Sequence, residues 1–258
     1  GSRGPVPIIE HPDVRKMLLT GRSFIDAARA LAIWTAMQMD IAARHPDPAE
    51  RRRADGFVAL LTPVVKAAFT DFGFETAVIS QQVFGGHGYI REWGMEQFVR
   101  DARITQIYEG TNGVQAMDLV GRKLPMEGGE LAGRFFDLVK QDLQAASLVP
   151  ATERIVAATA SALDRLERTT ELLLAGSGDP AVAGSAATDY LRLFALTAFG
   201  WMWAKMAASA AAADTPPKVR KCAVADFFAD RMLPQTLGLE TAIANGATSI
   251  IALNQDLF

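Results

Sequence analysis

The sequence predicts an all-α protein, and three observations support this prediction. Apolar residues recur at three- and four-residue steps through most of the chain, as they do along one face of a helix. Alternating polar and apolar runs rich in Val, Ile and Thr, which are typical of strands, are absent. Three cap-then-proline pairs mark helix starts: Asp47-Pro48, Asp179-Pro180 and Thr215-Pro216.

Four helical segments are expected in the first half. Residues 10–44 place apolar side chains on one face of a long helix. The second helix begins at Pro48, and Glu50, three residues after Asp47, is expected to complete a capping box. It should run to about Phe84, with a bend near Pro63 or Gly73. Shorter helices are expected at 96–103 and from about 112 to 123.

Residues 124–130, which combine Pro and Gly without periodicity, predict a linker and a domain boundary. The expected organisation is a short leader at 1–7, beginning with what looks like the remnant of a cleaved expression tag, and a helical domain at 8–123. A second helical domain of four to five helices, with an Ala-rich interior, should occupy 131–258.

Composition excludes several classes of function. Half of the 258 residues are hydrophobic, enough for one large core or two smaller ones, and 26 Lys and Arg against 29 Asp and Glu leave no basic stripe for nucleic acid. One cysteine, Cys222, and three separated histidines predict neither a disulfide framework nor a metal site. With no signal-peptide region visible, we expect a cytoplasmic protein.

One segment, residues 194–213, is long and apolar enough to be mistaken for a membrane span. It is half Ala and contains Lys205, whose charge is unfavourable in a bilayer centre, so we expect a buried helix there and no membrane span.

Only the stretch 81–115 is unusual for a helical scaffold, because two glycine-dependent turns lie 21 residues apart. The first, Gly85-Gly86-His87-Gly88, suits either a close backbone approach to a ligand or a simple helix end followed by a turn. In the second, Tyr108-Glu109-Gly110-Thr111, the carboxylate suits either a reaction or the positive end of a helix dipole. Each turn alone leaves both interpretations open.

Taken together, these motifs resemble the C-terminal signature of the flavin-dependent acyl-CoA dehydrogenases. The resemblance rests on the order and spacing of three strings: QVFGGHGY at 82–89, RDAR at 100–103 and IYEGT at 107–111. It extends over about residues 8–123. The string TNGVQAMDLVGRKL at 111–124 looks most like the long bacterial members, which carry an additional helical domain that would correspond to residues 131–258.

The resemblance implies a reaction and its residues. In this family a carboxylate base removes a proton from Cα of an acyl-CoA thioester while a hydride leaves Cβ for FAD, which gives the trans-2-enoyl-CoA. The position matching that base is Glu109, whose backbone N–H would also bind the thioester carbonyl, and Gly110 would let substrate pass close to the backbone. A carboxylate suits this work when the acyl chain excludes water around it.

The resemblance also implies two sets of FAD contacts. Gln82, Gly85 and Gly86 would approach FAD held mainly by a neighbouring subunit, whereas Thr111 and Gly113 would lie beside the FAD of their own subunit. Where many relatives have Gln or Glu, this chain has Gly113, so only a backbone contact is implied there. His87 is expected to be a surface turn residue, and Arg100 and Arg103 are expected to pair with Asp101 or Glu96.

The helical domain and the β-domain that precede this region in the family have no counterpart in the chain. We therefore expect a C-terminal fragment of such an enzyme, unable to hold FAD alone. The resemblance further implies a homodimer or homotetramer and electron-transferring flavoprotein as electron acceptor. Two alternatives stay open: a helical assembly module with an unused dehydrogenase signature, which Glu109 argues against, and the alkylation-response branch of the family, which the near-neutral charge argues against.

Overall fold

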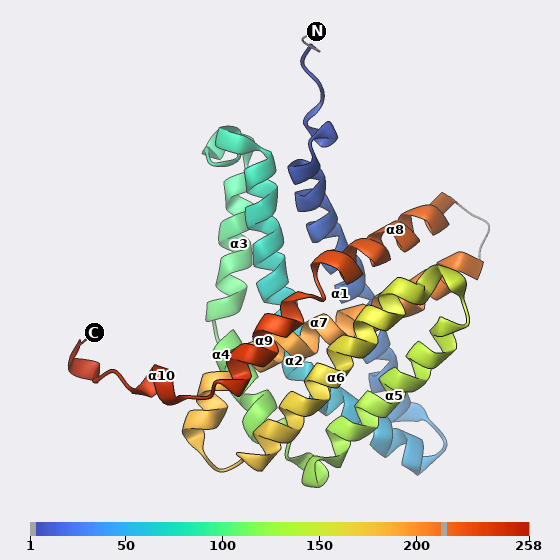
Figure 1. Ribbon diagram of the computed structural model, residues 1–258, viewed down its shortest axis with the longest axis vertical. Coiled ribbons are helices and arrows are strands. Elements are labelled where there is room, and N and C mark those ends of the chain that lie inside the picture. Colours follow the sequence, from blue (N-terminus) through green and yellow to red (C-terminus); the bar gives the residue numbers. More distant parts are fainter. Residues whose placement is uncertain (1–3, 213–215, 258) are drawn as a thin grey trace.

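The protein is all-α, as predicted. A computed structural model describes residues 4–212 and 216–257, and within them it contains α-helices joined by short turns and no strand. In Figure 1 the first helices form an upright group, and the later helices pack across its lower part.

The first two helices, α1 (Pro12–Arg44) and α2 (Pro48–Val83), lie against each other along their lengths. They begin and end close to the predicted positions. The α2 helix continues through both expected bend positions, Pro63 and Gly73, as one element. Its buried side carries apolar residues from Phe57 to Phe72, and these meet the buried side of α1 in the core.

The start of α2 confirms the cap and contradicts the capping box. The carboxylate of Asp47 accepts a hydrogen bond from the backbone N–H of Ala49 at 2.8 Å. Glu50 turns away and forms an ion pair with Arg53 at 2.5 Å, while the N–H of Asp47 donates to Nδ1 of His45 at 3.2 Å. The box fails because an arginine one turn along and a preceding histidine offer both groups other partners.

After α2 the chain reverses through the short helical turns η2 (Gly85–Gly88) and η3 (Arg91–Trp93). It returns along α2 as α3 (Met95–Ile107), which extends further at its carboxyl end than the predicted 96–103. The chain then enters α4 (Asn112–Asp118), which runs on into a wider helical turn at Leu119–Lys123. The hairpin of α2 and α3 projects from one end of the molecule (Figure 1).

The second half consists of α5 (Glu130–Ser147), α6 (Glu153–Ala175), α7 (Pro180–Ala212), α8 (Pro216–Arg231), α9 (Gln235–Ala244) and the short α10 (Thr248–Ile251). The start of α7 is as predicted, since the carboxylate of Asp179 accepts from the N–H of Ala181 at 2.8 Å. Helix α8 begins at the expected proline, but its expected cap, Thr215, lies outside the described residues.

Helix α7 joins the two halves into one core. It packs against α1, α2 and α4 of the first half and against α5, α6, α8 and α9 of the second. The indole N–H of Trp203 in α7 donates to the carbonyl of Ser23 in α1 at 3.0 Å. Arg192 of α7 pairs with Glu75 of α2 at 2.5 Å. The turn at 124–130 therefore connects two helical segments that share a single hydrophobic core, with Leu124 itself completely buried.

Residues 194–204 and 207 of the apolar segment of α7 are buried, as expected, whereas Lys205, Met206 and residues 208–211 are partly buried or exposed, and Ala213 lies outside the described part of the chain. Among the described residues one helix, α2, is long and apolar enough to cross a membrane by length and composition alone. Its apolar side faces the core, which accounts for that composition.

Candidate active site

The predicted base lies on a short exposed loop between α3 and α4. Glu109 is exposed, and Gly110 follows it with a φ of +75°. An added Cβ at Gly110 would lie 3.3 Å from the side-chain nitrogen of Gln115, so glycine suits this position on both counts. The hydroxyl of Thr111 then accepts from the N–H of Val114 at 3.4 Å and caps α4.

A polar cluster lies behind this loop. The ammonium group of Lys66 on α2 donates to the backbone carbonyl of Thr105 at 3.0 Å and to Oδ1 of Asn112 at 2.7 Å. The amide nitrogen of Asn112 donates to Oδ1 of Asp71 at 2.6 Å, and that oxygen also accepts from Gln106 at 2.6 Å. Residues just before and just after the Glu109 loop are thus both bound to α2.

The predicted contacts to a neighbour's FAD lie at the tip of the α2–α3 hairpin. Gln82, Gly85 and Gly86 are all exposed there. Gly85 has a φ of +61°, and an added Cβ at Gly85 or Gly86 would meet no atom within 4 Å. Gly88 differs, because it is buried and its Cβ would lie 2.5 Å from the carbonyl oxygen of Gln81. In the first turn, therefore, Gly85 and Gly86 leave the backbone open, whereas Gly88 is required by packing.

The structure keeps the two groups of predicted site residues apart. Glu109, Thr111 and Gly113 lie at the carboxyl end of α3, and the hairpin glycines lie beyond its amino end. The 13 residues of α3 span about 20 Å at 1.5 Å per residue. Gly113, in the first turn of α4, is also exposed with an open backbone.

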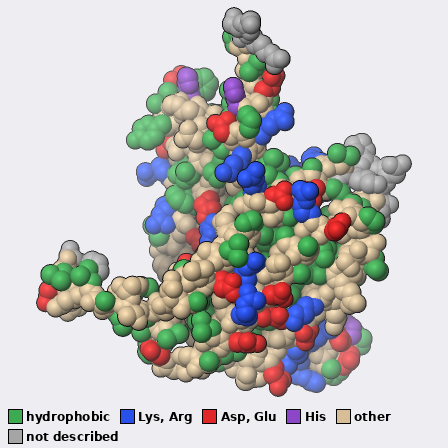
Figure 2. Space-filling model, in the orientation of Figure 1, with side chains coloured by type: hydrophobic (Ala, Val, Ile, Leu, Met, Phe, Trp, Pro, Cys, Tyr) green, Lys and Arg blue, Asp and Glu red, His purple; other side chains and the backbone are tan. Residues whose placement is uncertain are grey.

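Exposed apolar side chains surround both groups. At the hairpin tip the exposed fractions reach 79% for Tyr89 and 64% for Phe98. Near the loop, Ile107, Tyr108 and Val114 are more than half exposed. Figure 2 shows hydrophobic side chains gathered at the tip of this hairpin. Apolar surface of this extent is typical of a face that another protein surface covers.

The other residues singled out in this stretch give a mixed result. His87 is exposed and packs edge-on against Trp93, as expected of a surface turn residue. The expected ion pairs are wrong: within the described residues neither Arg100 nor Arg103 forms one, and Arg103 instead donates to Gln106 at 2.8 Å. The same described residues hold no group of His, Cys, Asp or Glu suited to a metal.

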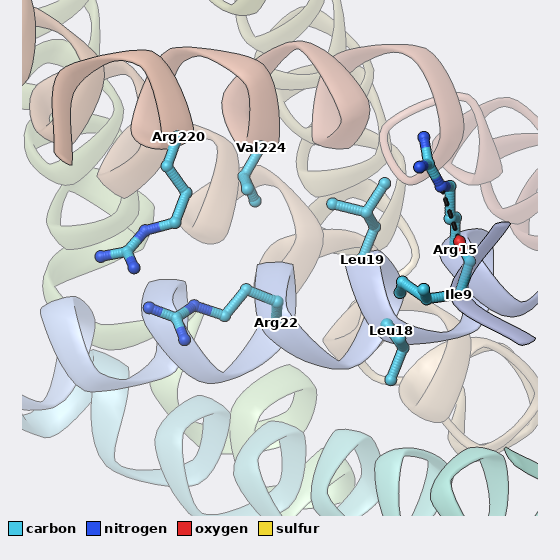
Figure 3. A pocket seen from close by; sticks show the side chains of 7 residues that line it. All are labelled: Ile9, Arg15, Leu18, Leu19, Arg22, Arg220 and Val224. Carbon is cyan, nitrogen blue, oxygen red and sulfur yellow. Dashed lines mark hydrogen bonds between the residues drawn. The ribbon is translucent and has the colours of Figure 1, made fainter. Parts of the chain in front are cut away.

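A concave region away from the predicted site lies between α1 and α8, with a volume of about 410 Å³ and three arginines along it. Figure 3 shows Arg22 and Arg220 at one end, and Arg15 at the other. Arg22 donates to Asp26 at 3.0 Å, and Arg15 donates to the carbonyl of Ile9 at 2.8 Å. Two of the three guanidinium groups thus already have partners within the protein.

Sequence reasoning did not find the polar cluster behind the loop. The available signal was Lys66, the sole charged residue of the apolar run from Phe57 to Thr70. An isolated cation on the inner side of a helix requires polar partners. Its partners are 39 and 46 residues away in the sequence, which is why no local pattern identified them.

Comparison with known protein families identifies the class of protein to which this fold, with its glycine turns and its carboxylate loop, belongs. The family described as "Acyl-CoA dehydrogenase, C-terminal domain" matches residues 3–124, and that described as "Acetyl-CoA dehydrogenase C-terminal like" matches residues 135–254. The chain belongs to the acyl-CoA dehydrogenase family and corresponds to its C-terminal helical region.

Individual relatives extend this finding. The chain is 37% identical over 253 residues to 3-methylmercaptopropionyl-CoA dehydrogenase of Ruegeria pomeroyi, covering 95% of this chain and 43% of that protein. It is 28% identical over 269 residues to the broad-specificity linear acyl-CoA dehydrogenase FadE5 of Mycobacterium tuberculosis, covering 98% of this chain and 44% of the relative. The chain thus spans less than half the length of these two relatives.

A solved structure shares the fold. The match to the crystal structure of Caenorhabditis elegans ACDH-11 in complex with C11-CoA covers 82% of this chain and 35% of the ACDH-11 chain, with a TM-score of 0.70 and 20% sequence identity. At that identity the likeness concerns the arrangement of the helices alone.

Proposed function

We propose that this chain is the C-terminal helical part of an FAD-dependent enzyme that converts an acyl-CoA thioester to its trans-2-enoyl-CoA. The observation that carries the proposal is the Glu109 loop. It presents an exposed carboxylate, followed by a glycine at positive φ, between two helix ends that are both bound to α2. This arrangement suits a base that must reach a substrate from a fixed position.

In this proposal Glu109 accepts the proton that leaves Cα of the thioester. Its backbone N–H donates to the thioester carbonyl, whose oxygen gains negative charge as the proton departs. Gly110 removes the side chain that would otherwise obstruct substrate beside the base. The bound acyl chain would displace water from around the carboxylate, so that the Cα proton is transferred to Glu109 without competition from solvent.

The residues present fit FAD, because Gly85, Gly86 and Gly113 all have open, exposed backbones that a flat or phosphate-bearing ligand could approach closely. When bound, FAD supplies the acceptor for the hydride that leaves Cβ. Thr111 and Gly113 would hold the FAD of their own subunit.

We assign Gln82, Gly85 and Gly86 to the FAD of a neighbouring subunit. Their exposure at the hairpin tip, about 20 Å along α3 from the Glu109 loop, supports this assignment, since it leaves them open to another protein surface. The exposed apolar side chains at the hairpin tip support a homodimer or homotetramer. We further propose that the domains which precede this region in the family lie outside this chain, and that electron-transferring flavoprotein reoxidises the enzyme.

The test is Glu109→Gln in the full-length, FAD-loaded enzyme. The amide keeps the shape of the side chain but is no base, so flavin reduction by acyl-CoA should slow by at least about 10²-fold. Anaerobic stopped-flow absorbance measures that rate, and FAD content and acyl-CoA binding should be unchanged. The matched control is Glu153→Gln, which alters another exposed carboxylate at the start of α6. A Glu109→Gln enzyme that reduces its flavin at nearly the parental rate would contradict the assignment of the base.

A further inference from the structure

The loop that carries Glu109 is held at both ends by one side chain. Lys66 donates to the carbonyl of Thr105, in the last turn of α3, and to Oδ1 of Asn112, the first residue of α4. Between those two partners lie the six residues 106–111. A single ammonium group therefore connects the start and the end of the loop across its base.

Each contact of Lys66 uses its positive charge. The carbonyls at the carboxyl end of a helix carry partial negative charge, so a cation bound to Thr105 stabilises the end of α3. The ammonium nitrogen also lies over the exposed ring of Tyr108, 5.3 Å from the ring centroid. Tyr108 directly precedes Glu109, so the contact extends the clamp into the loop.

Asn112 connects the clamp to the rest of α2. Its Oδ1 accepts from Lys66 and from the hydroxyl of Thr70, at 2.7 and 3.1 Å, and its amide nitrogen donates to Asp71. Asp71 also accepts from Gln106, in the last turn of α3. All of these side chains are partly buried, whereas Glu109 is exposed. The network therefore orders the loop ends and leaves the carboxylate free to meet a substrate.

We propose that Lys66 is a positioning residue for Glu109. Because Lys66 binds both ends of the loop that carries Glu109, it fixes the place of the Glu109 carboxylate. The catalytic part of this inference rests on the proposed function, while the clamp itself does not. Lys66 touches no reacting atom in this account. Its effect is to hold the base at one distance from the substrate Cα, a geometry on which proton transfer depends steeply.

The first experiment uses this chain alone and measures amide hydrogen exchange. The N–H of Tyr108 is bonded to Ile104 and that of Gln115 to Thr111, so these amides report on the two edges of the loop. Lys66→Met, which keeps an unbranched side chain but removes the charge, should raise exchange at both by about tenfold. Lys66→Arg should retain part of the protection. Lys140→Met, which breaks an ion pair with Glu167 in another part of the fold, should leave the loop unchanged.

Asn112→Ala provides a second route if Lys66→Met does not fold, because it removes the other half of the clamp without altering a charge. It should raise exchange at the same two amides. Unchanged exchange in whichever of these variants folds would overturn the clamp, regardless of any result on activity.

The second experiment tests positioning in the full-length, FAD-loaded enzyme. Lys66→Met should slow flavin reduction about tenfold or more with little change in KM, and substrate deuterated at Cα should show a larger isotope effect than in the parent. Lys66→Arg should recover part of the rate. If the loop loosens but rate and isotope effect stay at parental values while Glu109→Gln is slow, Lys66 is structural and the positioning role is overturned. If Glu109→Gln also reduces flavin at the parental rate, the proposed function fails and the clamp stands.

Discussion

A close approach of two helices in the second half gives a sharp test of the fold. Gly200 of α7 lies against Thr159 of α6, and an added Cβ would lie 2.7 Å from Thr159 Oγ1 and 3.1 Å from its Cγ2. A Cδ atom of Leu233 would be 3.2 Å away on the other side. Rotating Thr159 about χ1 moves only one of its two heavy atoms away, so Gly200→Ala must push the helices apart.

The expected change in the free energy of unfolding follows from two opposing effects. In an unobstructed helix interior, Gly→Ala stabilises by up to about 1 kcal/mol. Overpacking of a well-packed core costs about 1–3 kcal/mol. Gly184, in the same helix, has no atom within 4 Å of an added Cβ and is the matched control. The free energy of unfolding of Gly200→Ala should therefore be about 1–3 kcal/mol lower than that of Gly184→Ala.

Urea and thermal unfolding followed by circular dichroism measure this difference, which corresponds to about 2–4 °C in Tm per kcal/mol for a chain of this size. Combining Gly200→Ala with Thr159→Ala should recover most of the loss, because both crowding atoms of the threonine are removed. The hydroxyl of Thr159 is buried without a hydrogen-bond partner among the described residues, so its removal should itself cost little. Equal stability of Gly200→Ala and Gly184→Ala would refute the close approach of α6 and α7.

Two further outcomes are expected of this chain. Burial alone raises the pKa of Asp26, but hydrogen bonds and positive charges from Lys221 and Arg22 lower it by more, so its pKa lies below the ordinary value. A carboxyl group with a lowered pKa in the folded state stabilises the fold above about pH 4 and loses that contribution as pH falls further. Asp26→Asn should therefore lower the free energy of unfolding by about 1–2 kcal/mol at pH 7 and by progressively less below pH 4. Urea unfolding at a series of pH values measures this difference. Incubated with excess FAD and then desalted, the chain should show no flavin absorbance, because the few open backbone positions cannot offset the ordering of so flexible a ligand; a stoichiometric yellow protein that bleaches with acyl-CoA would contradict this.

Most of the fold could be predicted because helix signals are local. The caps at Asp47 and Asp179, with the proline that follows each, act within one turn, and both helices begin as expected. The capping box at Glu50 was wrong for a related reason: the glutamate has a second local partner, Arg53, and the pattern does not state which partner is bound.

The candidate site was predictable in part. The signature around Glu109 and the glycines at 85–88 stand out in the sequence because two glycine-dependent turns at that spacing are unusual for a helical scaffold. The partners of Lys66 and the packing role of Gly88 did not stand out. Lys66 binds residues in two later helices, and Gly88 is required only because the chain folds back onto Gln81.

The sequence by itself determined the family, the helical class and the position of the carboxylate loop, because each depends on residues that are neighbours along the chain. The tertiary structure alone decided that α7 unites both halves in one core, that the two glycine motifs lie at opposite ends of α3, and that a lysine of α2 binds both ends of the Glu109 loop. These features depend on which helix faces meet, and apolar periodicity reports that a face is buried without identifying its partner.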